Sequence, residues 1–303
     1  MGDPGELKKK KIAVLLGGMS SEREISILSG NAVLASLKRS GYRAKAIDAG
    51  RDLAAQLAKE RIEVAFIALH GRWGEDGTVQ GLLELLAIPY TGSGVLASAL
   101  AMDKCVSKLL LMGLDVPTPA YRICSSPAEA EFPLPFVVKP AREGSTVGIS
   151  IVRRDHEREG AIRTAFGYDR KLLLEQYVQG EEITVGVVNG TALPIVEVKP
   201  KSGFYDYTSK YTKGMTEYLV PAPIDEECAK RAREEALAIW HGFELAGAAR
   251  IDMILEREMP LVIDINTSPG MTETSLVPKA WENLGKSFDQ LVEEILLGAA
   301  LKT

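Results

Sequence analysis

The chain has 303 residues, of which 25% are charged and 46% are hydrophobic, and its formal net charge at pH 7 is -5. This balance is typical of a globular protein and excludes a chain that is disordered over its length. The longest basic run is only residues 8–11, and because nucleic-acid binding needs a basic face, we expect no nucleic-acid partner.

The first third of the sequence alternates short apolar runs with helical patterns. Strands are predicted at residues 12–16, 43–47 and 64–69, helices at about 22–39 and 52–60, and a solvated tail at residues 8–11. This βαβαβ order predicts a parallel sheet, whose ligands lie beyond the carboxyl ends of the strands. We therefore expect ligand-binding residues within 17–21 and 70–77.

Two polar residues stand at or beside these positions. His70 ends the run Phe-Ile-Ala-Leu-His, and its place at a strand end favours a functional role over that of an ordinary core or surface histidine. Glu22 lies in the first turn of a predicted helix, where a favourable interaction with the helix dipole explains it as well as a ligand role does. The pattern G-x-G-x-x-G is absent, which argues against a dinucleotide cofactor.

A second segment begins near residue 99. Helices are predicted at 104–112 and 154–166, and strands at 136–139, 149–152 and 171–177. The apolar stretch 95–116 is interrupted by Asp103, Lys104 and Lys108, so we expect no membrane span. The three cysteines have no metal or redox spacing, and we interpret them as reduced thiols of a cytoplasmic protein.

Lys139 stands at the end of a strand that has the pattern of a buried one, just before the glycine-flanked loop 144–148. A buried ammonium is costly unless it meets an anion, and the N–H groups of such a loop can bind phosphate. The alternative is a flexible hairpin loop with a lysine that reaches solvent. The loop lacks the Gly-Lys-Ser/Thr ending of a Walker A motif. Lys104 is a candidate second phosphate contact, although singly it fits an exposed lysine at a helix start.

The strand at 171–177 runs into a segment that has the pattern of a nucleotide-base site. The backbone of residues 175–178 can hydrogen-bond a flat heterocycle between apolar side chains, but an ordinary strand end has the same pattern.

The third segment contains predicted strands at 183–188 and 193–198, a polar aromatic loop at 201–214 and a long amphipathic helix. Apolar residues between 232 and 243 recur at helical spacing and are assigned to the core, with Gly247 as the predicted helix stop.

A hairpin is predicted over residues 247–266. With a five-residue turn at 256–260, Leu255 opposes Leu261, so that Asp252 opposes Asp264 and Arg250 opposes Asn266, all on one face. Facing carboxylates repel unless a cation lies between them, and oxygen ligands suit Mg²⁺. The alternative is the polar, solvent-facing side of an ordinary hairpin. The loop 267–272 that follows offers backbone N–H groups to an anion.

Eight separated motifs occur in one order along nearly the whole chain. They are LLGGMSSEREIS (15–26), ALHGRWGEDGTVQ (68–80), PYTGSG (89–94), MDK (102–104), KPAREGS (139–145), FYDY (204–207), KY (210–211) and NTSPGM (266–271). In this set the sequence closely resembles the D-alanine:D-alanine ligases of the ATP-grasp superfamily.

The resemblance implies a mixed α/β (α+β) ATP-grasp fold. An N-terminal parallel-sheet domain would span residues 1–98, a small central lid domain 99–180, and a C-terminal antiparallel-sheet domain 181–303. It also implies ATP-dependent ligation of two D-alanines through an acyl phosphate, for peptidoglycan precursors, by a cytoplasmic homodimer with no membrane partner. The implied cofactors are ATP and two Mg²⁺ ions, with Mn²⁺ as a substitute.

The resemblance also implies roles for individual residues. Catalytic roles fall on Glu22, Ser145, Tyr211, Arg250 and Gly270. D-Alanine would contact Glu22, His70, Lys210, Ser275 and Leu276. ATP would contact Lys104, Lys139, Glu175, Gln176, Tyr177, Val178 and Glu182. The metal ligands would be Asp252, Asp264 and Asn266, which agrees with the hairpin pattern.

One departure is that Asp264 stands where many relatives have the longer Glu. Three alternatives remain open from the sequence: a D-alanine:D-lactate ligase, another ATP-grasp carboxylate–amine ligase, and a nucleotide-binding protein without activity. A dehydrogenase is disfavoured by the missing glycine pattern.

Overall fold

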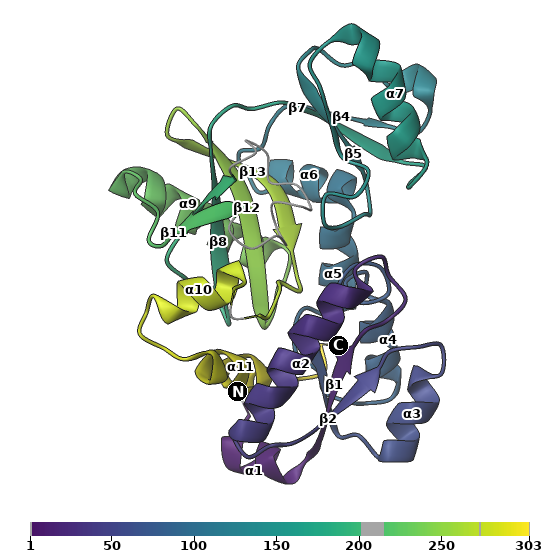
Figure 1. Cartoon of the computed structure of the whole chain (residues 1–303), viewed down its shortest axis with the longest axis vertical. Coiled ribbons are helices and arrows are strands. Elements are labelled where there is room, and N and C mark those ends of the chain that lie inside the picture. Colours follow the sequence, from purple (N-terminus) through teal and green to yellow (C-terminus); the bar gives the residue numbers. More distant parts are fainter. Residues whose placement is uncertain (1, 201–214, 273, 303) are drawn as a thin grey trace.

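The computed structural model describes residues 2–200, 215–272 and 274–302. Within them the chain forms three β-sheets, of three, four and six strands. Figure 1 shows the N-terminal sheet at one end of the molecule, the four-stranded sheet at the other end, and the largest sheet between them on one side. The mixed α/β class with one parallel and two antiparallel sheets confirms the predicted fold class.

The first sheet is parallel, in the order β2-β1-β3. Its elements and connections are β1 (Lys11–Leu16), α2 (Arg23–Arg39), β2 (Arg43–Asp48), α3 (Leu53–Glu60), β3 (Val64–Ile67) and α4 (Thr78–Leu85). Its central strand β1 is buried from Ile12 to Leu16, as a continuous apolar run in a parallel sheet requires. The βαβαβ prediction is confirmed.

The solvated tail predicted before β1 is wrong in part. Residues Pro4–Lys9 form helix α1, with Asp3 accepting a hydrogen bond from the Gly5 N–H at 3.0 Å. Leu7 anchors this turn because its side chain is buried in a core shared with the C-terminal helix. The side chains of Lys8 and Lys9 do face solvent.

The second sheet is antiparallel, in the order β4-β7-β5-β6. Its strands are β4 (Tyr121–Cys124), β5 (Phe136–Pro140), β6 (Ser150–Val152) and β7 (Leu172–Gln176); η1 (Pro127–Glu129) follows β4, and α7 (Asp155–Phe166) covers the sheet. The sequence patterns did not predict β4. Helices α5 (Val95–Met102) and α6 (Lys104–Gly113) connect the first sheet to this one.

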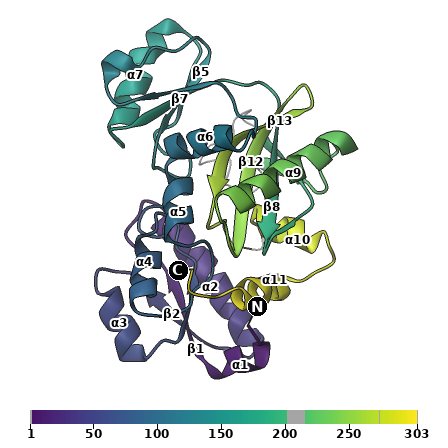
Figure 2. The ribbon, with the colours of Figure 1, turned by 180° about the vertical axis from the view of Figure 1, so that it is seen from behind.

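The third sheet is antiparallel, in the order β11-β10-β8-β12-β13, with β9 beside β8. Its strands are β8 (Glu181–Val188), β9 (Thr191–Ala192), β10 (Val196–Pro200), β11 (Thr216–Leu219), β12 (Ala248–Glu256) and β13 (Met259–Asn266). Helix α9 (Glu226–Gly242) packs with α5 and α6 against one face, as Figure 2 shows for α9. Helices α10 (Leu276–Glu282) and α11 (Phe288–Leu297) join the core on the other side.

Two predictions for this segment are wrong. The strand predicted at 193–198 begins later, because residues 193–195 are not in a strand and separate β9 from β10. Helix α9 ends at Gly242, and not near Gly247. Glu244 has a φ of 55°, and the Leu245 N–H donates to the Trp240 carbonyl at 2.9 Å, which completes the helix end. Gly247 instead directly precedes β12, and a Cβ at this residue would lie 2.7 Å from the Gly92 backbone nitrogen.

The three sheets lie within residues 11–67, 121–176 and 181–266. The domain limits at 98/99 and 180/181 stay predictions. Among the residues described, no helix combines the length and the apolar character that a membrane crossing needs.

Candidate active site

The hairpin of β12 and β13 brings Asp252 opposite Asp264 and Arg250 opposite Asn266, as predicted. The predicted turn is wrong, however. The turn has two residues, Arg257 and Glu258, with φ values of 49° and 69°, so Leu255 pairs with Pro260 and not with Leu261. A β-bulge after Asp252 places one extra residue in β13 and restores the predicted pairing.

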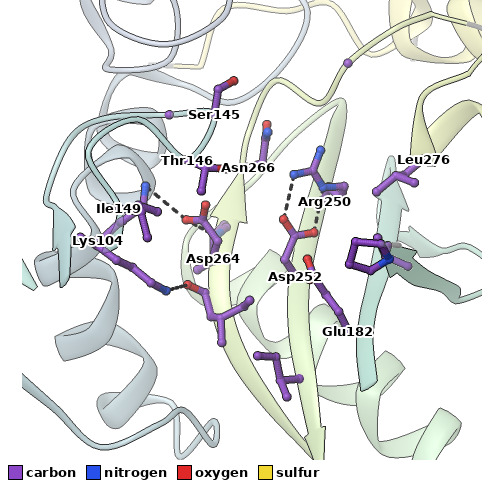
Figure 3. A pocket seen from close by; sticks show the side chains of 18 of the residues that line it. Lys104, Ser145, Thr146, Ile149, Glu182, Arg250, Asp252, Asp264, Asn266 and Leu276 are labelled. Atoms are coloured by element: carbon purple, nitrogen blue, oxygen red, sulfur yellow. Dashed lines mark hydrogen bonds and ion pairs between the residues drawn. The ribbon is translucent and has the colours of Figure 1, made fainter. Parts of the chain in front are cut away.

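Arg250 and Asp252 form a bidentate ion pair between two residues of the same strand, β12. The Arg250 Nε and Nη2 atoms each lie 2.8 Å from a different Asp252 carboxylate oxygen, as Figure 3 shows. The Thr184 hydroxyl, from β8, donates to Asp252 Oδ1 at 2.7 Å. The side chains of both charged residues are less than one-fifth exposed. This pairing neutralises a carboxylate that would otherwise be costly to hold in the cavity.

Asp264 and Asn266 face the same cavity from β13. Lys104 Nζ lies 3.5 Å from Asp264 Oδ1. Two carboxylates and an amide oxygen are the donors that Mg²⁺ prefers, so the chemistry of this set fits the ion. In the residues that the structure describes, no group of three His, Cys, Asp or Glu side chains is arranged to hold a metal, which leaves the amide of Asn266 and other oxygen donors to complete such a site.

Lys139 and Glu175 form a buried ion pair at the wall of the cavity. Lys139 Nζ lies 2.5 Å from a Glu175 oxygen, and it donates to the Ile263 carbonyl at 3.2 Å. Burial raises the pKa of Glu175, but Lys108 and Lys139 more than offset this, so the pKa of Glu175 lies below its usual range. Lys139 therefore meets an anion, although a carboxylate of the chain itself is its partner in this structure.

The glycine-containing loop after β5 is held against Lys104 and Glu22. Lys104 donates its backbone N–H to the Ala141 carbonyl and its ammonium to the Glu143 carbonyl, both at 2.9 Å. Ser145 has a φ of 48°, and its hydroxyl donates a short hydrogen bond to the Glu22 carboxylate. Gly144 approaches the same carboxylate closely, since a Cβ at this position would collide with a Glu22 oxygen unless the Glu22 side chain moved.

His70 is buried at the carboxyl end of the first sheet, where the strand-end rule placed it. Its Nε2 atom lies 3.0 Å from the Ser29 hydroxyl, which also accepts the Met271 N–H at 3.2 Å. Burial lowers the pKa of His70, so the imidazole is neutral at pH 7. Ser29 thereby links His70 to the loop after β13, a link that no motif of the sequence indicated.

Glu75 is a second carboxyl group beside Glu22. It accepts a short hydrogen bond from the Gly71 N–H. Burial, followed by the charge of Glu22, raises the pKa of Glu75 to about 8. Glu75 is therefore protonated at pH 7, and the sequence motif that contains it did not identify it as a site residue.

Gly270, Ser275 and Leu276 line the same cavity. A Cβ at Gly270 would lie 2.9 Å from the Ser275 hydroxyl, so this loop passes close to the start of α10. The Ser275 hydroxyl accepts the Thr272 N–H at 3.1 Å. These contacts hold Gly270 and Ser275 together, and Leu276 follows Ser275 as the first residue of α10.

The nucleotide-base segment after β7 also reaches the cavity, which Gln176, Tyr177, Val178 and, from β8, Glu182 help to line. The Gln176 N–H donates to the Ala120 carbonyl at 2.8 Å, and the Tyr177 N–H donates to the Pro135 carbonyl at 3.2 Å. This segment is therefore fixed by its neighbours at the edge of the cavity.

The cavity has a volume of about 890 Å³. Of the predicted site residues within the described ranges, all line it. Lys210 and Tyr211 lie outside the described residues. The volume is in the range of sites that enclose a nucleotide-sized ligand.

Comparisons with known proteins show the family of this chain. Residues 48–93 match the family described as "D-ala D-ala ligase N-terminus", and residues 120–297 match "D-ala D-ala ligase C-terminus". A D-alanine–D-alanine ligase of Syntrophotalea carbinolica is 53% identical over 304 residues, which cover 98% of both chains. The chain belongs to the D-alanine–D-alanine ligase family.

Solved structures extend the D-alanine–D-alanine ligase assignment to the fold. A ligase of this family from Bacillus anthracis, complexed with ATP, is 32% identical, with a TM-score of 0.82, and 95% of this chain and 96% of that chain are covered. The VanG D-Ala:D-Ser ligase of Enterococcus faecalis is 29% identical, with a TM-score of 0.80 and coverage of 94% and 98%. The predicted family and the ATP-grasp fold are confirmed.

Proposed function

We propose that this chain joins two D-alanine molecules to form D-alanyl-D-alanine, while ATP is converted to ADP and phosphate. The observation that carries the proposal is that one cavity is lined by two lysines, two aspartates, Glu22 and His70, in a chain of this ligase family. The product serves peptidoglycan precursor synthesis.

The reaction needs an activated carboxylate, because a free carboxylate is a poor electrophile. The γ-phosphoryl group of ATP passes to one D-alanine carboxylate, and ADP leaves. The amine of the second D-alanine then attacks the acyl phosphate, loses a proton and expels phosphate. An amide bond has formed and an acyl–phosphate bond has broken.

ATP would lie along the second and third sheets. Lys104 and Lys139 supply positive charge for the phosphates, Glu175, Gln176, Tyr177 and Val178 surround the adenine, and Glu182 binds the ribose. The burial of Lys139 and the fixed backbone of the adenine segment support this placement.

Asp252, Asp264 and Asn266 would hold two Mg²⁺ ions, and Mn²⁺ would serve as a substitute for Mg²⁺. Bound there, the metal ions neutralise charge on the transferring phosphoryl group. The shorter Asp264 retains the charge of the glutamate that many relatives have at this position. Removal of metal by EDTA should stop turnover, and added Mg²⁺ or Mn²⁺ should restore it.

D-Alanine would lie at the Glu22 end of the cavity. Glu22 binds the ammonium of the first D-alanine, and the neutral His70 lies near its carboxylate. Ser145 and Tyr211 extend the Glu22 hydrogen-bond network to the second amine. Lys210, Ser275 and Leu276 surround the second carboxylate.

The tetrahedral intermediate develops negative charge on one oxygen. Arg250 and the Gly270 N–H would bind this oxyanion, where positive charge and a fixed donor are most effective. The position of Arg250 on the cavity wall supports this role.

We further propose a homodimer that works in the cytoplasm, where ATP is available. The buried, reduced cysteines suit that compartment. Sedimentation of the purified protein tests the oligomeric state: a mass of one chain at micromolar concentration would overturn the dimer.

The central test is turnover. Purified protein with D-alanine, ATP and Mg²⁺ should release phosphate and dipeptide in equal amounts, and L-alanine should give neither. Without D-alanine-dependent phosphate release, the proposed function is wrong. Adding D-lactate or D-serine as the second substrate, with product analysis, distinguishes this ligase from its depsipeptide-forming and D-serine relatives.

A further inference from the structure

A lysine with no role in the proposed reaction is buried next to the predicted nucleotide site. Lys108, on α6, has only 3% of its side chain exposed. Its ammonium contacts the Glu175 carboxylate and the Thr118 hydroxyl, and it donates to the Val262 carbonyl at 3.2 Å. A buried ammonium costs several kcal/mol unless it is paired. Its retention beside the site therefore calls for a reason.

Glu175 is shared between two lysines. Lys108 contacts one carboxylate oxygen, and Lys139 contacts the other at 2.5 Å. The Glu175 side chain is 2% exposed. One carboxylate between two ammonium groups gives a cluster of net positive charge, so a single lysine is enough to balance Glu175.

The two lysines differ in their access to the cavity. Among the described residues that line it are Lys139 and Glu175, but not Lys108. Lys108 lies behind Glu175, against Val262 of β13. A ligand in the cavity can therefore attract Lys139 away from Glu175, whereas Lys108 stays in place.

We propose that Lys108 is a positioning residue for ATP: it balances the charge of Glu175, so that Lys139 is free to bind a nucleotide phosphate. The inference rests on the proposed function, in which Lys139 binds ATP. With Lys108 present, movement of Lys139 leaves Glu175 with a buried cationic partner. Without it, the same movement leaves an unpaired buried carboxylate, and ATP must compete with Glu175 for Lys139.

Substitution of Lys108 by methionine tests this directly, because methionine is similar in length and carries no charge. In Lys108→Met we expect the Kd for ATP, measured by calorimetry, to rise by about 10-fold or more, since breaking a buried charge pair has effects of this size. The KM for D-alanine should stay within about twofold of the wild-type value.

Lys302→Met is the matched control. Burial lowers the pKa of Lys302, as it does that of Lys108, and the Lys302 ammonium donates to the Gly298 carbonyl at 3.2 Å, away from the cavity. This variant should bind ATP as the wild type does. An equal loss of affinity in both variants would show a general effect of removing a part-buried lysine, and would overturn the proposal.

A second substitution provides a charge rescue that a purely structural role would not produce. In Lys108→Met/Glu175→Gln the carboxylate that holds Lys139 is gone, so ATP should bind more tightly than to Lys108→Met. Equal or weaker binding would contradict the proposal. If Lys108→Met does not fold, the double variant is compared with Glu175→Gln, and a Kd that is 10-fold higher in the double variant would also contradict it.

The same measurements separate this inference from the proposed function. If the wild type shows neither ATP binding nor D-alanine-dependent turnover, the proposed function fails. If the wild type binds ATP and turns over, but Lys108→Met has an unchanged Kd for ATP, only the role of Lys108 fails.

Discussion

Asp252 shows how one residue is suited to two partners. In this structure Arg250 neutralises it through two 2.8 Å contacts on the same strand. In the proposed reaction Arg250 binds the oxyanion and Asp252 binds a metal ion. Each residue would therefore exchange its present partner for a ligand. When no ligand is bound, the two opposite charges neutralise each other, so neither is left unpaired in the cavity.

We expect Asp252→Asn to reduce turnover by at least about 100-fold, because the variant loses the charge that would hold a metal ion at the phosphoryl group. The protein should still fold, because the asparagine oxygen accepts hydrogen bonds from Arg250 Nε and Thr184, but loss of the ion pair should lower the melting temperature by a few degrees. Phosphate release and thermal melting measure the two effects.

Asp289→Asn is the control, because Asp289 pairs with Arg39 at 2.6 Å on the surface. It should leave turnover unchanged. Full activity of Asp252→Asn would refute the metal assignment.

At the scale of elements, the strand register of the β12–β13 hairpin determines which side chains face each other in the site. Two features set this register: the short turn shifts it by one residue, and the bulge shifts it back. The two-residue turn by itself would place Ile263 opposite Asp252, with its side chain where a ligand should be. The bulge adds one residue and brings Asp264 opposite Asp252. The extra residue of the bulge is Ile263, and its carbonyl accepts a hydrogen bond from Lys139.

Helix α9 contains a buried acid that serves no site. Glu235 is 9% exposed, and within the described structure its Oε2 atom has no hydrogen-bond partner. Burial raises the pKa of Glu235 to about 7, although Arg231 opposes the rise. Between pH 4.5 and 7 the folded protein holds a proton that the unfolded chain has released, so stability falls as pH rises through this window.

Glu235→Gln should remove this cost. We expect its melting temperature to exceed that of the wild type by about 1–3 °C at pH 8, and the difference to disappear near pH 4. The exposed neighbour Glu234 provides the control, since Glu234→Gln should melt as the wild type does at both values. A pH-independent difference would show that ionisation of Glu235 is not the cause.

At the scale of the molecule, the cavity is lined by residues of the second and third sheets together with α2 and the loop that follows β3. The proposed ATP site is formed by the second sheet, α6 and the third sheet. A bound nucleotide would therefore contact all three of these parts of the chain at once. Ligands that bind only the folded state stabilise it in proportion to the logarithm of their concentration over Kd.

ATP at about 100 times its Kd should therefore raise the melting temperature by about 5 °C. Adenosine at the same concentration should give a smaller shift, because it lacks the phosphates that Lys104 and Lys139 would hold. Equal shifts for the two ligands would contradict the phosphate assignment of these lysines.

The sequence by itself determined the parallel first sheet, most of the later elements, the family and the pairing of Asp252 with Asp264. These follow from periodicity and from short motifs, which are local properties of the chain. The turn length was wrong because the two positive φ values and the bulge are not encoded in the alternation of apolar residues. The predicted helix stop at Gly247 was wrong because that glycine serves a close approach to Gly92.

Only the tertiary structure decided which partner each charged residue has. Lys139 meets Glu175, Arg250 meets Asp252, and Glu75 lies beside Glu22, although each pair except the second is distant in the sequence. The tertiary structure also showed that Lys108 is buried beside Glu175, whereas in the sequence Lys108 looks like any other lysine of a helix. The physical reason is that burial and charge pairing depend on what several elements bring together in space, and these interactions determine the energetic cost of each charge.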